Sequence, residues 1–246
     1  MTVIYFVLLA LIAEVLGTVG GFGSSMYFVP IAKYFLDFHT VLGITALFHV
    51  VSNLTKIQLF FKGINYSIAV KMGIPAVIFV VIGAFLSTSI NSTQFELLIA
   101  ILLFLVAILF LIYKNYKMPV TNLNQFIGGS GSGFAAGLVG TGGAIRGLFL
   151  SGFGLTHETY ISTSALIDLG VDVSRSIVYL SHDYIGIENW YLIPILFVVS
   201  IIGTYIGKKI LEKTSQEMFR KLSLVLIVLI AVSVLVKALI TEYISF

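Results

Sequence analysis

The sequence contains no cysteine, so a disulfide framework, a thiolate nucleophile and a cysteine-based metal site are all excluded. Charge is also scarce, because only 10% of the 246 residues are Asp, Glu, Lys or Arg, whereas 59% are hydrophobic. Soluble domains of this size carry far more charge, and this composition therefore indicates a polytopic membrane protein. The net charge of +3 does not indicate a nucleic-acid-binding protein.

The motifs of several enzyme classes are missing as well. No glycine-rich stretch is followed by the Lys-Ser/Thr pair that a phosphate-binding loop needs. His39 and His157 have no carboxylate partner at the spacing of metal ligands. We therefore expect no enzymatic activity, no catalytic residues, no metal site and no cofactor.

Glycine is plentiful and is concentrated in two similar stretches. The first break, Gly17–Gly23, and the second break, Gly137–Gly143, each hold four glycines in seven residues and lie inside apolar runs. Each glycine costs about 1 kcal/mol relative to Ala in a helix interior, so both stretches are expected to interrupt a helix. Lipid tolerates a broken helix only where the backbone is buried in protein or lines a wet cavity. Two breaks in corresponding halves indicate the binding site of a transporter.

The breaks are part of a longer internal repeat. Gly17, Gly20 and Gly23 recur 120 residues later as Gly137, Gly140 and Gly143. At an offset of 119, Asn53 corresponds to Asp172, Lys56 to Arg175 and Pro75 to Pro194. We therefore divide the chain into a first transmembrane repeat (1–113), a linker (114–122) and a second transmembrane repeat (123–246).

Each repeat contains five apolar segments. They are predicted at 2–17, 24–36, 40–61, 67–90 and 95–113, and at 123–138, 144–154, 157–181, 188–208 and 216–240. The second segment of each repeat is shorter than the roughly 20 residues that a helix needs to span a bilayer. These two segments either cross the membrane or re-enter on the same side, which leaves the number of crossings between 6 and 10.

The basic residues predict opposite orientations for the two repeats. Lys56, Lys62 and Lys71 follow the third segment of the first repeat, and this loop is therefore expected to be cytoplasmic, as is the basic linker. The corresponding loop of the second repeat, 181–188, is acidic and is expected to be external. The predicted fold is an all-α polytopic protein of the cytoplasmic membrane, built from two inverted-topology repeats that each start with a glycine-broken helix.

This arrangement resembles the sulfite exporter TauE/SafE family of membrane permeases. The resemblance covers nearly the whole chain and rests on the two homologous halves, the two breaks and Pro30 shortly after the first break. The second copy departs from the pattern, with Leu150 at the position of Pro30 and with Arg146 following the glycines. The resemblance implies export or uptake of sulfite, sulfonates and related organic anions.

Arg146 is the main candidate for binding such an anion. It falls in the first turn of the helix that follows the second break, where free N–H groups and the helix dipole favour negative charge. The alternative interpretation is an ion pair between Arg146 and Glu14, Asp168 or Asp172. The predicted substrate-binding residues are Gly20, Gly21, Gly23, Ser24, Ser25, Gly140, Thr141, Gly142, Gly143 and Arg146.

A second group of residues is a candidate for coupling to protons. Its members are Glu14, His49, Asn53, Asp168, Asp172 and Arg175, which are polar or charged residues inside apolar segments. The alternative interpretation is structural, with an Asp172–Arg175 ion pair and hydrogen bonds between helices from His49 and Asn53. Lys56 is expected to extend to the cytoplasmic surface.

Together these observations predict a secondary transporter that moves a small anion by alternating access, with a proton as a candidate coupling ion. An anion-selective channel with the same breaks is the alternative. The expected partners are the anionic substrate and the lipid bilayer, with no nucleic acid. The sequence leaves the identity of the anion, the direction of transport and a homo-oligomeric state open.

Overall fold

The computed structural model describes residues 2–21, 23–112 and 117–215, together with positions 218, 225 and 232, and is helical throughout these ranges apart from turns and loops. The helices are α1 (Thr2–Gly20), α2 (Ser25–Ala32), α3 (Phe38–Leu59), η1 (Phe61–Gly63), α4 (Tyr66–Ser87), α5 (Ser92–Ile112), α6 (Asn122–Val139), α7 (Gly143–Gly152), α8 (His157–Ser181), η2 (Ile187–Asn189) and α9 (Leu192–Leu211). Most of the predicted segment 216–240, part of the linker and Phe22 lie outside the described residues.

Local capping determines where the long helices begin. The side chains of Asp37, Asn65, Thr121 and Thr156 each accept a hydrogen bond from the backbone N–H three residues later. Such N-cap residues satisfy one of the N–H groups that the first turn of a helix leaves free. The nine described α-helices match the first nine predicted segments, and the all-α prediction is confirmed for the part of the chain that the structure describes.

The second segment of each repeat is confirmed to be short. Helix α2 has 8 residues and α7 has 10. At 1.5 Å per residue they are about 12 and 15 Å long, well below the ~30 Å thickness of the hydrocarbon core. Phe28 of α2 and Phe35 beyond it both contact Phe6 near the start of α1, with ring centroids 5.7 and 5.4 Å apart. The chain therefore turns back beside α1 after the first break.

Four stretches of the described residues are long and apolar enough to cross a membrane, namely Val3–Gly20, Phe38–Leu59, Tyr66–Ser87 and Ile187–Leu211. Helix α4 has a continuous apolar face, on which Val70, Ile74, Ile78, Ile82 and Phe85 are each at least 44% exposed. Exposed apolar faces of this extent suit lipid rather than water. The chain is thus a helical membrane protein.

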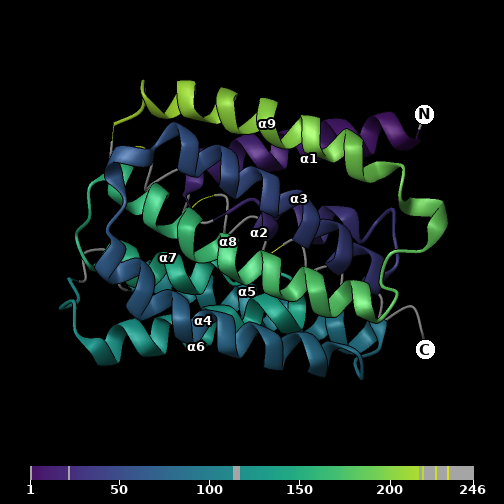
Figure 1. Ribbon diagram of the computed structural model, residues 1–246, viewed down its shortest axis with the longest axis horizontal. Coiled ribbons are helices and arrows are strands. Elements are labelled where there is room, and N and C mark those ends of the chain that lie inside the picture. The colour runs from purple at the N-terminus through teal and green to yellow at the C-terminus, as the bar shows by residue number, and fades with distance from the viewer. Residues whose placement is uncertain are drawn as a thin grey trace.

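Six of the described helices associate in three pairs, which Figure 1 shows one below the other. Helices α1 and α9 form one pair, α3 and α8 the central pair, and α4 and α6 the third. Each outer pair joins the first helix of one repeat to the fourth segment of the other. Glycines permit the close approach in α9, where a Cβ atom added at Gly207 would lie 2.6 Å from Thr18.

The central helices α3 and α8 run in opposite directions. Gly43, near the start of α3, is close to Ile185 beyond the end of α8, and Gly63, beyond the end of α3, is close to Glu158 in the first turn of α8. Equivalent helices of the two repeats therefore lie side by side and antiparallel. An inverted repeat requires this packing, and the inverted orientation of the whole repeats stays a prediction.

Candidate functional site

The two glycine breaks meet in the middle of the bundle. The hydroxyl of Ser25, at the start of α2, donates a hydrogen bond of 3.3 Å to the hydroxyl of Thr141, just before α7. Within the breaks, Gly23 and Gly140 have φ angles of 83° and 79°, which side-chain-bearing residues rarely adopt. Glycine thus allows the chain to reverse and brings the starts of the two short helices together.

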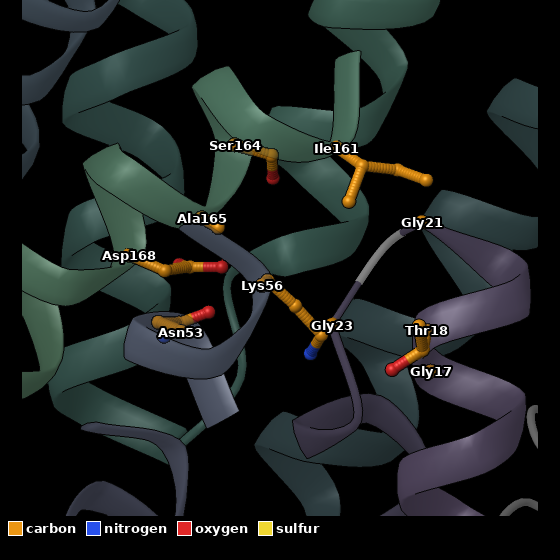
Figure 2. A pocket seen from close by; sticks show the side chains of 10 residues that line it. All are labelled: Gly17, Thr18, Gly21, Gly23, Asn53, Lys56, Ile161, Ser164, Ala165 and Asp168. Atoms are coloured by element: carbon orange, nitrogen blue, oxygen red, sulfur yellow. The ribbon is translucent and has the colours of Figure 1, made fainter. Parts of the chain in front are cut away.

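A small cavity with a volume of about 10 Å³, room for roughly one water molecule, lies beside the first break and between the two repeats (Figure 2). It is lined by Gly17, Thr18, Gly21, Gly23, Asn53, Lys56, Ile161, Ser164, Ala165 and Asp168. The first six come from α1, the first break and α3, and the other four come from α8. Any molecule in this cavity would therefore contact both repeats.

Arg146 forms an ion pair instead of facing the cavity directly. Its two terminal nitrogens donate to the two carboxylate oxygens of Asp168, and its Nε donates to Ser164 Oγ at 2.8 Å. Arg146 is 1% exposed, whereas the side chain of Asp168 is 16% exposed and lines the cavity. Of the two interpretations of Arg146, the structure shows the ion pair with Asp168, and anion binding by Arg146 stays a prediction.

Asp172 and Arg175 form a second ion pair, on the next turn of α8. Arg175 Nε donates to Asp172 Oδ1 at 2.8 Å, and Asn53 Nδ2 donates to Asp172 Oδ2 at 2.7 Å. Arg175 Nη1 also donates to the carbonyl oxygens of Ala136 and Gly140, at 3.1 and 2.8 Å. These carbonyls belong to the end of α6, where the backbone lacks the N–H donors that a further helical turn would supply and carries a partial negative charge. The ion pair therefore holds the second break against α8.

Glu14 lies at the centre of a third polar cluster and is completely buried. Its carboxylate accepts hydrogen bonds from the hydroxyls of Thr18, Ser24, Ser52 and Thr204. The ammonium group of Lys56 lies 3.0 Å from Glu14 Oε1. Glu14 is therefore paired with Lys56 and not with Arg146.

The expectation that Lys56 reaches the cytoplasmic surface is wrong. Lys56 is 5% exposed, and its Nζ donates to Ser52 Oγ at 2.6 Å in addition to pairing with Glu14. Burial is tolerated because the opposite charge of Glu14 compensates the ammonium group. His49, two turns earlier on α3, is also buried, and its Nε2 lies 2.9 Å from Ser24 Oγ. His49 thus joins α3 to the start of α2, as the structural interpretation expects.

The predicted site residues fall into four groups. Gly21, Gly23, Asn53 and Asp168 line the cavity, whereas Ser24, Ser25 and Thr141 connect the two breaks and their neighbours. Gly142 packs against α6, because an added Cβ atom would overlap the carbonyl oxygen of Ser132. Gly20, Gly140, Gly143, Arg146, Glu14, His49, Asp172 and Arg175 are not among the residues that line the cavity.

The prediction did not include Lys56 or Thr18 in the site, although both line the cavity. A signal for Lys56 was present, because it lies three residues after Asn53, which lies four residues after His49, and these spacings place all three on one face of a helix. Thr18 lies inside the first break, where any side chain is close to the point at which the helix ends.

A comparison with known protein families matches residues 6–234 to the family described as sulfite exporter TauE/SafE. A search of curated proteins gives no match. The family match spans both breaks and all three polar clusters, and it confirms the resemblance noted from the two glycine-rich breaks. The chain belongs to the sulfite exporter TauE/SafE family of membrane transport proteins.

Proposed function

We propose that the chain is a secondary transporter that moves sulfite, a sulfonate or a related organic anion across the cytoplasmic membrane by alternating access. Family membership gives the coarser part, a membrane transporter of sulfite or related anions. The observation that carries the finer part is the cavity between the two repeats, beside the first break and with Lys56 in its wall.

The chemistry of the cavity suits an anion. An anion that enters a membrane protein loses water, and fixed donors must replace its hydration. Lys56, Thr18, Ser164 and Asn53 bring donor groups to the lining, and in the described conformation the donors of Lys56, Thr18 and Asn53 are held by Glu14 and Asp172. The helix starts at Ser25 and Gly143 do not line the cavity, but they lie near the Ser25–Thr141 contact and carry the N–H groups and partial positive charge that favour oxyanions at helix N-termini.

Arg146 is the strongest anion-binding group near the cavity. Its planar fork of donors matches two oxygens of a sulfite or sulfonate group as well as it matches a carboxylate. In the described conformation Asp168 occupies that fork. Binding at Arg146 thus requires the anion to displace the Asp168 carboxylate, and Ser164 stays in place to orient the guanidinium through Nε.

The opposite end of α8 is closed by aromatic packing. Tyr179 Oη donates to the carbonyl of Gly137 at 2.6 Å, and the Tyr179 ring stacks on Tyr184 with centroids 4.8 Å apart. Tyr184 Oη lies 2.8 Å from Ser87 Oγ at the end of α4. In alternating access, rocking of one repeat against the other opens this end while it closes the cavity.

The test is flux in liposomes that contain the purified protein. The panel is sulfite, sulfate, thiosulfate, taurine, sulfoacetate, acetate and chloride, with and without imposed gradients of pH and potential. A carrier gives saturable uptake and trans-stimulation by the same anion on the far side. Potential-driven passage of several anions without saturation supports the channel alternative instead.

A matched pair of variants tests the place of Arg146. Arg146→Ala is expected to abolish saturable flux, because the anion loses its two-point partner. Lys209→Ala removes the same charge from an exposed position on α9 and is expected to retain full flux. Full flux through folded R146A protein would show that Arg146 is not part of the binding site.

A further inference from the structure

Three buried ion pairs lie around the cavity, and their charges balance. They are Glu14–Lys56, Asp168–Arg146 and Asp172–Arg175. Each pair joins one carboxylate to one cation, so these six described residues supply no net charge for an incoming anion. An added anion would leave one uncompensated negative charge inside the membrane, which is costly. Uptake of one proton together with the anion would restore the balance.

Two of the three carboxylates are poorly placed to accept that proton. Glu14 is enclosed by four hydroxyl donors and Lys56, so its oxygens are already occupied by donors. The side chain of Asp172 is 3% exposed and is held by Asn53 and Arg175. Neither residue is among those that line the cavity.

Asp168 differs from both, because its carboxylate lies between Arg146 and the cavity. It is 16% exposed and part of the cavity wall, while its partner Arg146 is 1% exposed behind it. An anion that approaches from the cavity meets this carboxylate before it reaches the guanidinium. The first break passes close to Asp168, since a Cβ atom added at Gly23 would lie 3.8 Å from Asp168 Oδ2.

The charges that act on Asp168 come from several helices. Arg146 on α7 and Lys56 on α3 are cations. Helix α8 itself contributes the carboxyl group of Asp172, the guanidinium of Arg175 and the titratable phenol of Tyr160. His49 on α3 is bound to Ser24. Lys71 on α4 and Lys62 on η1 are exposed, and α6 has no charged residue. Once Asp168 is neutral, Arg146 lacks its counter-charge, and the cavity becomes attractive to an anion.

We propose that Asp168 is a proton-dependent lock on Arg146: the carboxylate takes up one proton from solution, releases the guanidinium, and the substrate anion takes its place. This inference rests on the proposed transport function and identifies Asp168 as the group that couples anion to proton. No covalent bond changes except the new O–H bond of Asp168. A singly charged anion that moves with this proton carries no net charge across the membrane.

The test compares sulfite binding to detergent-solubilised wild type, Asp168→Asn and Glu158→Gln over a range of pH. D168N mimics the protonated carboxyl group, and Glu158 is an exposed carboxylate in the first turn of the same helix. Sulfite changes its own charge with pH, and the ratio of two affinities at each pH cancels that change. Relative to the affinity of D168N for sulfite, the affinities of wild type and E158Q are expected to fall about tenfold per pH unit in the alkaline range, because binding is coupled to one proton.

If the ratio of the sulfite affinities of wild type and D168N does not change with pH, the lock is overturned and the transport proposal stays intact. Absence of sulfite binding to wild type at every pH contradicts the transport proposal, and the lock with it. If D168N does not fold, the test is the number of protons that wild type takes up when it binds sulfite. Saturating sulfite, added at a pH where free sulfite is the singly charged bisulfite ion, is expected to bring about one proton per protein. No uptake overturns the inference.

Discussion

Ser25 and Thr141, 116 residues apart in the chain, share a hydrogen bond of 3.3 Å between their hydroxyl groups. This contact joins the start of α2, two residues after the first break, to the second break, and it is therefore part of the interface between the two repeats. A carrier whose repeats move against each other must change this interface in each cycle. A channel whose breaks stay fixed does not need to change this interface.

The absence of cysteine makes this contact simple to test. In the double variant S25C/T141C, mild oxidation is expected to form a disulfide, because the hydroxyl separation of 3.3 Å places the two Cβ atoms within reach of one. We expect anion flux in liposomes to fall to background on oxidation and to return on reduction. The single variants S25C and T141C are the controls, and their flux should not respond to the oxidant. Undiminished flux in fully cross-linked protein would contradict movement at this contact.

Much of the architecture could be predicted because the relevant signals are local. Apolar runs and capping residues define the helices, and the predicted segment 157–181 has the bounds of α8. The two breaks were also evident, because clustered glycines inside an apolar run have few structural uses other than interrupting a helix.

The partners of the buried charges could not be predicted in the same way. Arg146 had three candidate carboxylates, and only the packing of α7 beside α8 selects Asp168. Lys56 was expected at the surface because it is near the end of α3, but α1 places Glu14 within 3.0 Å of its ammonium group. Such pairs depend on the relative rotation and height of helices that are distant in the sequence, which neither spacing nor composition specifies.

The close approach of α6 to α4 leads to a second prediction. A Cβ atom added at Gly133 would overlap the carbonyl oxygen of Ala76, whereas one added at Gly131 would lie 3.6 Å from Ile145, an ordinary contact. G133A is therefore expected to lower stability in detergent by about 1–3 kcal/mol through overpacking. G131A, on the same helix, is expected to be neutral or up to about 1 kcal/mol stabilising, since Ala is the better helix former. Equal melting temperatures for the two variants would contradict the observed packing.

The Glu14–Lys56 pair leads to a third prediction, measured by thermal unfolding in detergent. Glu14→Gln removes one partner of a buried ion pair and leaves the Lys56 ammonium uncompensated, at an expected cost of about 3–5 kcal/mol. The double variant E14Q/K56M removes both charges and is expected to recover most of that loss. A double variant as unstable as E14Q would show that Glu14 acts through its four hydroxyl partners rather than through Lys56.

Tyr184, in the loop between α8 and η2, leads to a prediction about pH. Burial raises the pKa of Tyr184. The Ser87 hydroxyl already donates to the carbonyl of Ala84, so Tyr184 Oη is the donor in the 2.8 Å bond between them. The folded protein therefore favours the protonated phenol, which both the apolar surroundings and the hydrogen bond require.

Stability is consequently expected to fall as pH rises above about 10, the value at which tyrosine ionises in an unfolded chain. The unfolded state loses the Tyr184 proton there, whereas the folded state retains it, and the difference in bound protons favours unfolding. Tyr184→Phe is expected to cost about 1 kcal/mol at neutral pH through the lost hydrogen bond. Its stability should decline less steeply than that of wild type above pH 10, because phenylalanine has no proton to lose. Other buried tyrosines contribute equally to both proteins, so the difference between the two curves isolates Tyr184, and parallel curves would contradict a raised pKa at this position.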